Sequence, residues 1–174
     1  MKYLIPLLSI LLFLSCKKRQ QNSNEITKIE LSRSGAWADA GATIIIDSAL
    51  NYRYFDENKK QGYIGRIDEK FFDTLNKKFG SIKFKTMPAF GYQGCKDCDV
   101  FELMIHWGNK KRRIIKAWPI EVDSALNVLL WVNDSYKYVK LTPVKTAFIF
   151  ETNFPKERLD VDIDSVKFPP PVKQ

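Results

Sequence analysis

Cys95 and Cys98 are separated by two residues, a spacing that can support a disulfide, thiol redox chemistry or half of a metal site. A thioredoxin-type catalyst needs its first cysteine at a helix N-terminus, where the helix dipole lowers the thiol pKa. Here the pair precedes a predicted strand. A metal site needs about four ligands, and His106 is the only further candidate. We therefore expect a structural disulfide or loop clip, with inert thiols and redox or metal chemistry as alternatives.

His106 could act as a general base, but the spacing brings no Ser or Cys nucleophile near it. Four cations follow it at an expected hairpin tip: Lys110, Lys111, Arg112 and Arg113. This run could contact anionic headgroups, lipopolysaccharide or another polyanion, although a solvated hairpin end is the interpretation that we favour. We expect no catalytic constellation, no cofactor and no bound metal.

Several aromatic residues could form an exposed surface for a protein or glycan partner. We favour the alternative that they pack on a face of a sheet. They are Trp37, Tyr52, Tyr54 and Tyr63.

The first 15 residues have the parts of a secretory signal: the single charge of Lys2, an apolar run over residues 3–14, and a small residue before the cleavage point. The apolar run is too short to cross about 30 Å of hydrocarbon. Phe13-Leu14-Ser15-Cys16 resembles the lipobox of bacterial lipoproteins. That resemblance implies that Cys16 receives a diacylglycerol, that the chain is cut before it, and that the new amino terminus is acylated, for example with palmitate. An ordinary signal peptide followed by a chance cysteine is the alternative.

Residues 16–25 form a polar, basic tether that contains Lys17, Lys18 and Arg19. Each cation could add about 1 kcal/mol of attraction to anionic lipid. Lipoproteins exported to the cell surface in some bacteria resemble one another in having acidic residues at this place. The opposite sign here favours the periplasmic side of a membrane in the cell envelope. An exported protein seldom meets nucleic acid, so we expect no nucleic-acid partner.

Length and composition indicate a single globular domain. The chain has 174 residues, 45% hydrophobic and 28% charged, with a formal net charge of +8. Its three Cys and one His exclude a multi-His metal centre within one chain. We expect a signal peptide at 1–15, the tether at 16–25, one domain at 26–154 and a loose, Pro-containing tail at 155–174.

Hydrophobic periodicity predicts an α+β fold. Alternating or β-branched runs indicate short strands. We place the strands at residues 26–32, 42–47, 52–55, 63–67, 82–85, 100–107, 112–118 and 146–151. The economical architecture is an antiparallel sheet with two helices packed on one face. The order of hairpin then helix occurs twice, which suggests an internal pseudo-repeat.

Two helices are predicted between these strands. The first begins after Asp68 as N-cap, shows apolar residues at helical spacing, and ends at Gly80 in the C′ position. The second begins at Pro119, whose missing N–H costs nothing in the first turn, and runs to about Val132.

The hairpin at 100–118 allows a prediction of register. A three-residue loop of Gly108, Asn109 and Lys110 would leave Leu103 opposite Ile115. It would also pair Phe101 with Ala117, Met104 with Ile114, and Glu102 with Lys116, the last being a pair of opposite charges.

The stretch from Ile26 to about Tyr138 resembles the bacterial lipoprotein domain of unknown function 6438. The resemblance rests on Ile29-Glu30-Leu31, Ile44-Ile45-Ile46, Tyr52-Arg53-Tyr54, the segment Gly62–Ile67, Phe72 and Leu75. Members of that family often have two Cys and a Pro after the first strand, where this chain has the run 36–40 instead. The resemblance implies an envelope lipoprotein and carries no known activity. We therefore expect a binding or structural module. A redox protein using Cys95 and Cys98, or an inhibitor-like module that binds an envelope enzyme, is the alternative.

Overall fold

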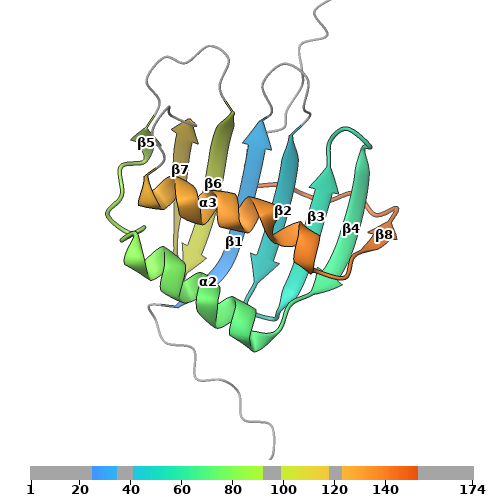
Figure 1. Ribbon diagram of the computed structural model, residues 1–174, viewed down its shortest axis with the longest axis horizontal. Coiled ribbons are helices and arrows are strands. Elements are labelled where there is room, and N and C mark those ends of the chain that lie inside the picture. Colours follow the sequence, from blue (N-terminus) through green and yellow to red (C-terminus); the bar gives the residue numbers. More distant parts are fainter. Residues whose placement is uncertain (1–24, 35–40, 92–98, 118–122, 153–174) are drawn as a thin grey trace, which may run out of the picture.

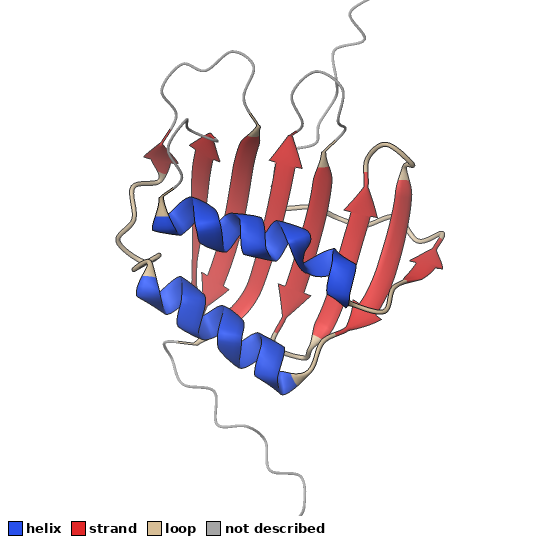
Figure 2. Cartoon of the chain, viewed as in Figure 1, coloured by secondary structure: helices blue, strands red, loops and turns tan. Residues whose placement is uncertain are grey.

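The computed structural model describes residues 25–34, 41–91, 99–117 and 123–152. Within these ranges the chain forms an eight-stranded sheet and two α-helices (Figures 1 and 2). The strands are β1 (Ile26–Ser34), β2 (Ala42–Asp47), β3 (Asn51–Asp56), β4 (Gln61–Arg66), β5 (Phe90–Gly91), β6 (Val100–Trp107), β7 (Lys110–Ala117) and β8 (Thr142–Val144). The helices are α2 (Glu69–Ser81) and α3 (Ser124–Asp134), followed by the short 3-10 helix η1 (Ser135–Tyr138).

The strands lie in the order β5-β7-β6-β1-β2-β3-β4-β8. Every neighbouring pair is antiparallel except β5 with β7, so the predicted antiparallel α+β class is confirmed. Both edges of the sheet end in very short strands, two residues in β5 and three in β8. The middle residue of β8 is Pro143, which pairs with Tyr63.

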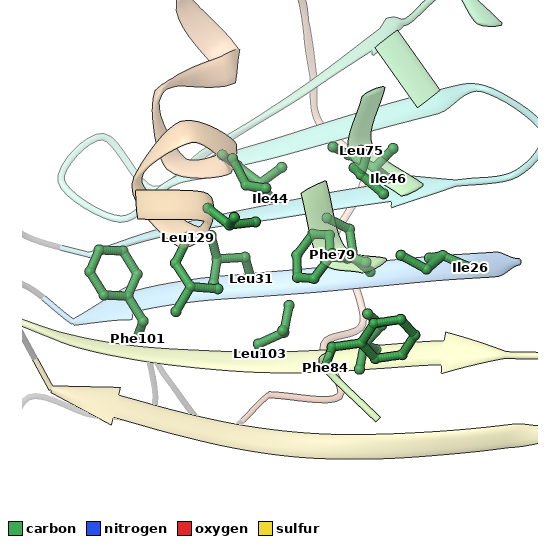
Figure 3. Close-up of a cluster of buried hydrophobic side chains, with 14 of the residues drawn as sticks. Ile26, Leu31, Ile44, Ile46, Leu75, Phe79, Phe84, Phe101, Leu103 and Leu129 are labelled. Carbon is green, nitrogen blue, oxygen red and sulfur yellow. The ribbon is translucent and has the colours of Figure 1, made fainter. Parts of the chain in front are cut away.

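Strand alternation gives the sheet an apolar face and a polar face. The apolar face, called the core face here, belongs to one buried cluster with side chains of α2 and α3 (Figure 3). Its strand residues include Ile29, Leu31, Ile44, Ile46, Leu103 and Ile105. In Figure 1 both helices are drawn in front of the sheet. Burying each such side chain contributes about 1.5–3 kcal/mol, so this cluster is the main source of stability.

Helix α2 begins as predicted but ends differently. The carboxylate of Asp68 accepts the backbone N–H of Phe71 at 2.7 Å, which confirms the N-cap. The expected stop at Gly80 is wrong, because the helix continues to Ser81 and the left-handed residue is Lys83, with φ of 50°.

The predicted strand at 82–85 is also wrong, because these residues form a tight turn. The carbonyl of Lys83 accepts the backbone N–H groups of Thr86 and Met87. Phe84 is 4% exposed and packs edge-on against Phe79 at 6.2 Å between ring centroids. The alternation of apolar and charged residues in this stretch therefore reflects one buried aromatic side chain in a turn.

Helix α3 begins at Ser124, so the predicted start at Pro119 is wrong. Asp123 is the N-cap, and its carboxylate accepts the N–H of Leu126 at 2.7 Å. A carboxylate that accepts an orphan N–H defines a helix start more strongly than a proline, which only tolerates the first turn. Residues 118–122 lie outside the described part of the chain.

The register predicted for the β6–β7 hairpin is wrong by one residue. The turn has two residues, Gly108 and Asn109, and Leu103 pairs with Ile114. Gly108 has φ of 51°, as the first central position of a type II′ turn requires. Type II′ turns are favoured in hairpins because their backbone twist matches that of the strands. Since the loop is one residue shorter than predicted, each β6 residue pairs with the β7 residue one position earlier. The observed pairs are Phe101 with Lys116, Glu102 with Ile115 and Met104 with Arg113.

The last predicted strand, at 146–151, does not join the sheet, and β8 lies before it at the β4 edge. In Figure 1 this orange-red part of the chain passes behind the strands. Ile149 is 90% exposed while Phe148 and Phe150 are half-buried. Exposed and half-buried side chains do alternate in this segment. The half-buried ones, however, pack on a face of the sheet, and the segment adds no strand at its edge.

Candidate functional site

Four polar side chains are buried on the polar face of the sheet. Glu30 and Ser32 on β1 and Glu102 on β6 are each 0% exposed, and Thr43 on β2 is 1% exposed. Ser32 pairs with Thr43 on one side and with Glu102 on the other, so the register places these side chains together. A buried carboxylate costs several kcal/mol unless it is paired or hydrogen-bonded. The partners of these carboxylates therefore decide what the face can do.

Residues 145–152, called the C-terminal crossing segment here, cover part of the polar face. The rings of Phe148 and Phe150 lie 6.4 and 5.5 Å from that of Phe55 on β3, measured between centroids. Gly62 on β4 leaves room for Phe148, because a Cβ there would lie 3.0 Å from its ring. Packing of these aromatic rings therefore holds residues 148–150 of the segment against the sheet.

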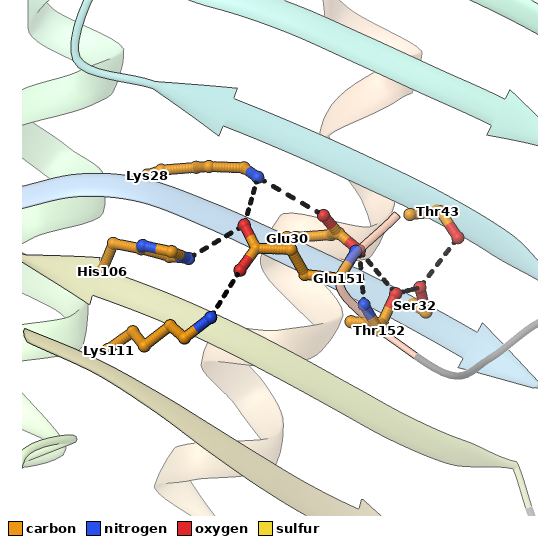
Figure 4. A network of polar contacts seen from close by, with 8 residues as sticks. All are labelled: Lys28, Glu30, Ser32, Thr43, His106, Lys111, Glu151 and Thr152. Carbon is orange, nitrogen blue, oxygen red and sulfur yellow. Dashed lines mark hydrogen bonds and ion pairs between the residues drawn. The ribbon is translucent and has the colours of Figure 1, made fainter. Parts of the chain in front are cut away.

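One oxygen of Glu30 fixes the second half of the segment (Figure 4). Its Oε1 accepts the backbone N–H groups of Glu151 and Thr152 and the hydroxyl of Thr152, each at 2.7 Å. Because that hydroxyl donates to Glu30, Ser32 donates to Thr152 at 2.6 Å, and Thr43 donates to Ser32 at 2.8 Å. The carboxylate therefore orients a chain of three hydroxyls across two strands.

The carboxylate of Glu151 lies close to basic side chains from three strands (Figure 4). Its Oε1 lies 2.6 Å from Nζ of Lys28 and 3.1 Å from Nε2 of His106, and its Oε2 lies 3.4 Å from Nζ of Lys111. Burial tends to raise the pKa of Glu151, but the hydrogen bond and charge of Lys28, the charge of His106 and the hydrogen bond of Lys111 hold it below its ordinary value of 4.5. Glu151 is therefore held as a carboxylate.

A histidine beside a carboxylate can serve as a general base when a nucleophile or substrate lies within reach. Here Nε2 of His106 is buried 3.1 Å from the Glu151 carboxylate and makes no hydrogen bond within the described residues. The hydroxyls of Ser32 and Thr152 are hydrogen-bonded to each other, and that of Thr152 also donates to the Glu30 carboxylate. The arrangement holds the crossing segment on the sheet.

The second buried carboxylate, Glu102, is paired with Arg113 on β7, with Nε 2.5 Å from Oε1. The predicted pair of Glu102 with Lys116 is therefore wrong. Lys116 forms an ion pair with Asp123, the N-cap of α3. Burial tends to raise the pKa of Asp123, but hydrogen bonds from Lys116 and from the N–H of Leu126 hold it below its ordinary value.

The basic run at 110–113 does not form one surface. Lys111 and Arg113 reach carboxylates on the polar face. Arg112 lies on the core face, where its guanidinium donates to two backbone carbonyls of the turn after α2. Lys110 is exposed beside the two-residue hairpin turn. The four side chains are therefore divided between the two faces of the sheet, and a contact of this run with a polyanion stays a prediction.

The predicted packing of the tyrosines is confirmed for Tyr52 and Tyr54. Tyr52 is 0% exposed, and its hydroxyl lies 2.7 Å from Oγ of Ser135. Tyr54 stacks on Tyr136 with ring centroids 4.7 Å apart, and Tyr63 lies 5.8 Å from Tyr54. Burial, followed by the charge of Asp56, raises the pKa of Tyr54 to about 12. Trp37 lies outside the described residues.

The three cysteines, Cys16, Cys95 and Cys98, also lie outside the described residues, which end at Gly91 and resume at Asp99 around the pair. Within the described ranges, no helix combines the length and apolar character that a membrane span requires. No three His, Cys, Asp or Glu side chains in those ranges come together as metal ligands.

A cleft of about 490 Å³ opens where the end of α2 meets the turn that follows it. Among the described residues that line it, two are lysines and none is acidic. They are Asn76, Gly80, Lys83, Phe84, Lys85 and Thr86.

Comparison with protein-family models, with curated proteins and with solved structures gives no match in any of the three. Function therefore has to be argued from the residues of this chain.

Sequence reasoning missed Glu30, Glu151 and Thr152 as a unit. Glu30 alternates with apolar residues in β1 as a solvent-facing residue would. Its partners lie more than 120 residues further along. The apolar run with Phe148 and Phe150 indicated an extended segment there but not the surface that it covers.

Proposed function

We propose that the chain is a bacterial envelope lipoprotein, anchored through a lipid on Cys16, whose single domain acts as a binding or structural module. The lipobox-like run 13–16 and the basic tether 16–25 support the anchor. Several acyl chains on one residue give durable membrane attachment, since a single chain binds only marginally. The resemblance to the domain of unknown function 6438 belongs to this proposal.

The contacts of the Glu30 and Glu151 carboxylates are the observation that favours a binding or structural module over an enzyme. The polar cluster around these two carboxylates binds backbone N–H groups and side chains of the crossing segment. Its groups therefore maintain the fold, where a catalytic cluster would point into open space for a substrate.

The two ends of the sheet differ in the segments of sequence that adjoin them. This difference supports a particular orientation of the domain relative to the membrane. Ser34, Val100 and Ala117 lie side by side at the end of the sheet opposite to the start of β1 at Ile26. Ser34 and Asp99, which adjoin this end, are the described residues that follow or precede the segments of sequence holding Trp37 and the Cys95–Cys98 pair. In the proposed orientation the anchor lies at the Ile26 end, and the opposite end is presented to an envelope partner on the periplasmic side.

The finer plan of the fold is part of the same proposal. Both helices pack on one face of the sheet, and each follows a hairpin, β3–β4 before α2 and β6–β7 before α3. The element order and the shared buried cluster support this hairpin–helix pseudo-repeat.

The test is mass spectrometry of the protein purified from envelopes, together with fractionation of a Cys16→Ser variant. We expect a diacylglyceryl group on Cys16 and loss of membrane attachment in the variant. An unmodified Cys16 in the natural product overturns the anchor. A labile Cys95–Cys98 bridge with a depressed thiol pKa would favour the redox alternative, and inhibition of an envelope enzyme by the purified protein would favour the inhibitor-like alternative.

A further inference from the structure

The end of the sheet where β1 begins is also the end of the β6–β7 hairpin turn. Ile26 pairs with Trp107, the last residue of β6, and Trp107 pairs with Lys110, the first residue of β7. In Figure 1 this is the lower end of the sheet, beside α2. The hairpin tip therefore lies next to the point where the tether joins the domain.

Three contacts place the lysine-lined cleft at this same end of the sheet. The side chain of Asn76, which lines the cleft, accepts the backbone N–H of Ile26 at 2.9 Å. The ring of Phe84 meets that of Trp107 edge-on, with centroids 5.2 Å apart. Arg112 donates to the backbone carbonyl of Lys85. The start of β1, the hairpin tip and the turn after α2 thus form one surface.

This surface presents positive charge to solvent. Lys83 and Lys110 are exposed, and among the described residues neither ammonium group makes an ion pair. Lys85 is partly exposed, with Nζ 5.8 Å from the centre of the Phe84 ring. We call Lys83, Lys85 and Lys110 the basic end. It differs from the linear run at 110–113, because it combines residues from two parts of the chain.

We propose that the basic end docks on the anionic phospholipid headgroups of the bilayer that holds Cys16, an inference that rests on the proposed lipid anchor. Nine residues separate Cys16 from Ile26, and fully extended they span at most about 30 Å. The tether therefore starts at the docking surface and keeps it near the headgroups. The cations at 17–19 have the same sign, so tether and basic end would be drawn to the same membrane.

The attraction should be electrostatic and additive. One basic residue close to an anionic surface raises membrane affinity about fivefold, and the effect fades within about 10 Å at 0.1 M salt. Three lysines at one surface should therefore raise affinity on the order of 100-fold. Docking would also orient the domain, because the opposite end of the sheet would then face away from the bilayer.

The test measures vesicle binding without the lipid anchor. A chain that begins at Lys17 keeps all described residues, and with them the whole buried cluster. Its binding to vesicles containing phosphatidylglycerol is compared with binding to pure phosphatidylcholine vesicles. The test variant combines Lys83→Gln, Lys85→Gln and Lys110→Gln. The control variant removes the same charge near the β4–β8 edge with Lys60→Gln, Lys140→Gln and Lys145→Gln, all exposed.

We expect the test variant to bind phosphatidylglycerol vesicles on the order of 100-fold more weakly than the unchanged chain, and the control variant less than about fivefold more weakly. High salt should remove the difference. Equal losses in both variants, or equal binding to neutral vesicles, overturn the docking surface. Equal thermal melting of the variants shows that folding is intact. The mass of Cys16 is measured separately, so a missing lipid would refute the anchor while the vesicle result still decides the docking.

Discussion

The carboxylate of Glu30 accepts the backbone N–H of Thr152 at 2.7 Å, across 122 residues of chain. The same oxygen accepts two further hydrogen bonds, from the N–H of Glu151 and from the Thr152 hydroxyl. Glu30 lies on β1, a central strand of the sheet. One buried side chain in the middle of the sheet therefore determines where the last described residues of the chain lie.

Glu30→Ala should lower the free energy of unfolding by about 3 kcal/mol, because two backbone N–H groups lose a charged acceptor in a buried site. Glu30→Gln should cost less, since the amide oxygen can still accept. Urea denaturation measures both values, with the exposed Glu69→Gln as a control within about 0.5 kcal/mol of the unchanged chain. Undiminished amide protection at Glu151 and Thr152 in the alanine variant would contradict this assignment.

Glu151 should make stability depend on pH in the acid range. Its folded pKa lies below 4.5 because Lys28, His106 and Lys111 outweigh its burial. Its contribution is therefore present above pH 4.5 and is lost as pH falls through the lower folded value. Glu151→Gln should cost about 0.5–1 kcal/mol at neutral pH and approach the unchanged chain in strong acid. Parallel stability curves for the two chains, measured from neutral to acid pH, would refute this.

Two glycines should respond to alanine in opposite ways. Gly80 lies inside α2 with nothing within 4 Å of an added Cβ, so Gly80→Ala should stabilise the fold by about 0.5–1 kcal/mol. A Cβ at Gly65 would lie 2.8 Å from the carbonyl oxygen of Lys140 and from a methyl group of Val139. Gly65→Ala should therefore destabilise by about 1–3 kcal/mol. Thermal melting compares the two, and a shift of the same sign would contradict the packing described.

Tyr52 and Ser135 should show coupled energetics. Their hydroxyls lie 2.7 Å apart in a buried site, and Ser135 also donates to the carbonyl of Val132 at 2.5 Å. Tyr52→Phe and Ser135→Ala should each lower the free energy of unfolding by about 1 kcal/mol. The double variant should cost less than the sum of the two changes. Strict additivity in denaturant titrations would show that the hydrogen bond contributes nothing.

Features set by local chemistry were predicted well from the sequence. Phe72, Leu75 and Phe79 lie at helical spacing and are all buried in α2. Asp68 caps that helix as its position before an amphipathic run indicated. The boundaries of β2 were also predicted, because an apolar run followed by Asp47 and a turn leaves little alternative.

The hairpin register and the end of α2 were predicted wrongly, because in each case two local structures were almost equally compatible with the sequence. A loop of two or three residues at Gly108 differs by one position, and that shift exchanges every partner of β7. Gly80 was taken for a helix end because glycine suits the left-handed conformation, which Lys83 adopts instead. These decisions depend on tertiary contacts, such as the burial of Phe84, that no local pattern displays.

The candidate site was the least predictable part. Its residues come from β1, β2, β6, β7 and the crossing segment. Lys28, Glu30 and Lys111 look like ordinary charged residues on half-exposed strands. Their arrangement follows from the order of strands in the sheet, which periodicity does not determine. His106 was noticed, but its partner Glu151 was assigned to a strand.

The two short edge strands have a consequence for a molecule packed among copies of itself. An exposed strand edge is a template on which another chain can add its own strand. Here one edge offers only the two residues of β5, and the other offers three residues interrupted by Pro143, which has no N–H to donate. Neighbouring copies crowded on one surface would therefore find only short ladders to extend at these two strands. The part of β7 that β5 leaves open begins with the four cations at 110–113, whose charge opposes the addition of a strand there, and the protein should resist self-association into fibrils.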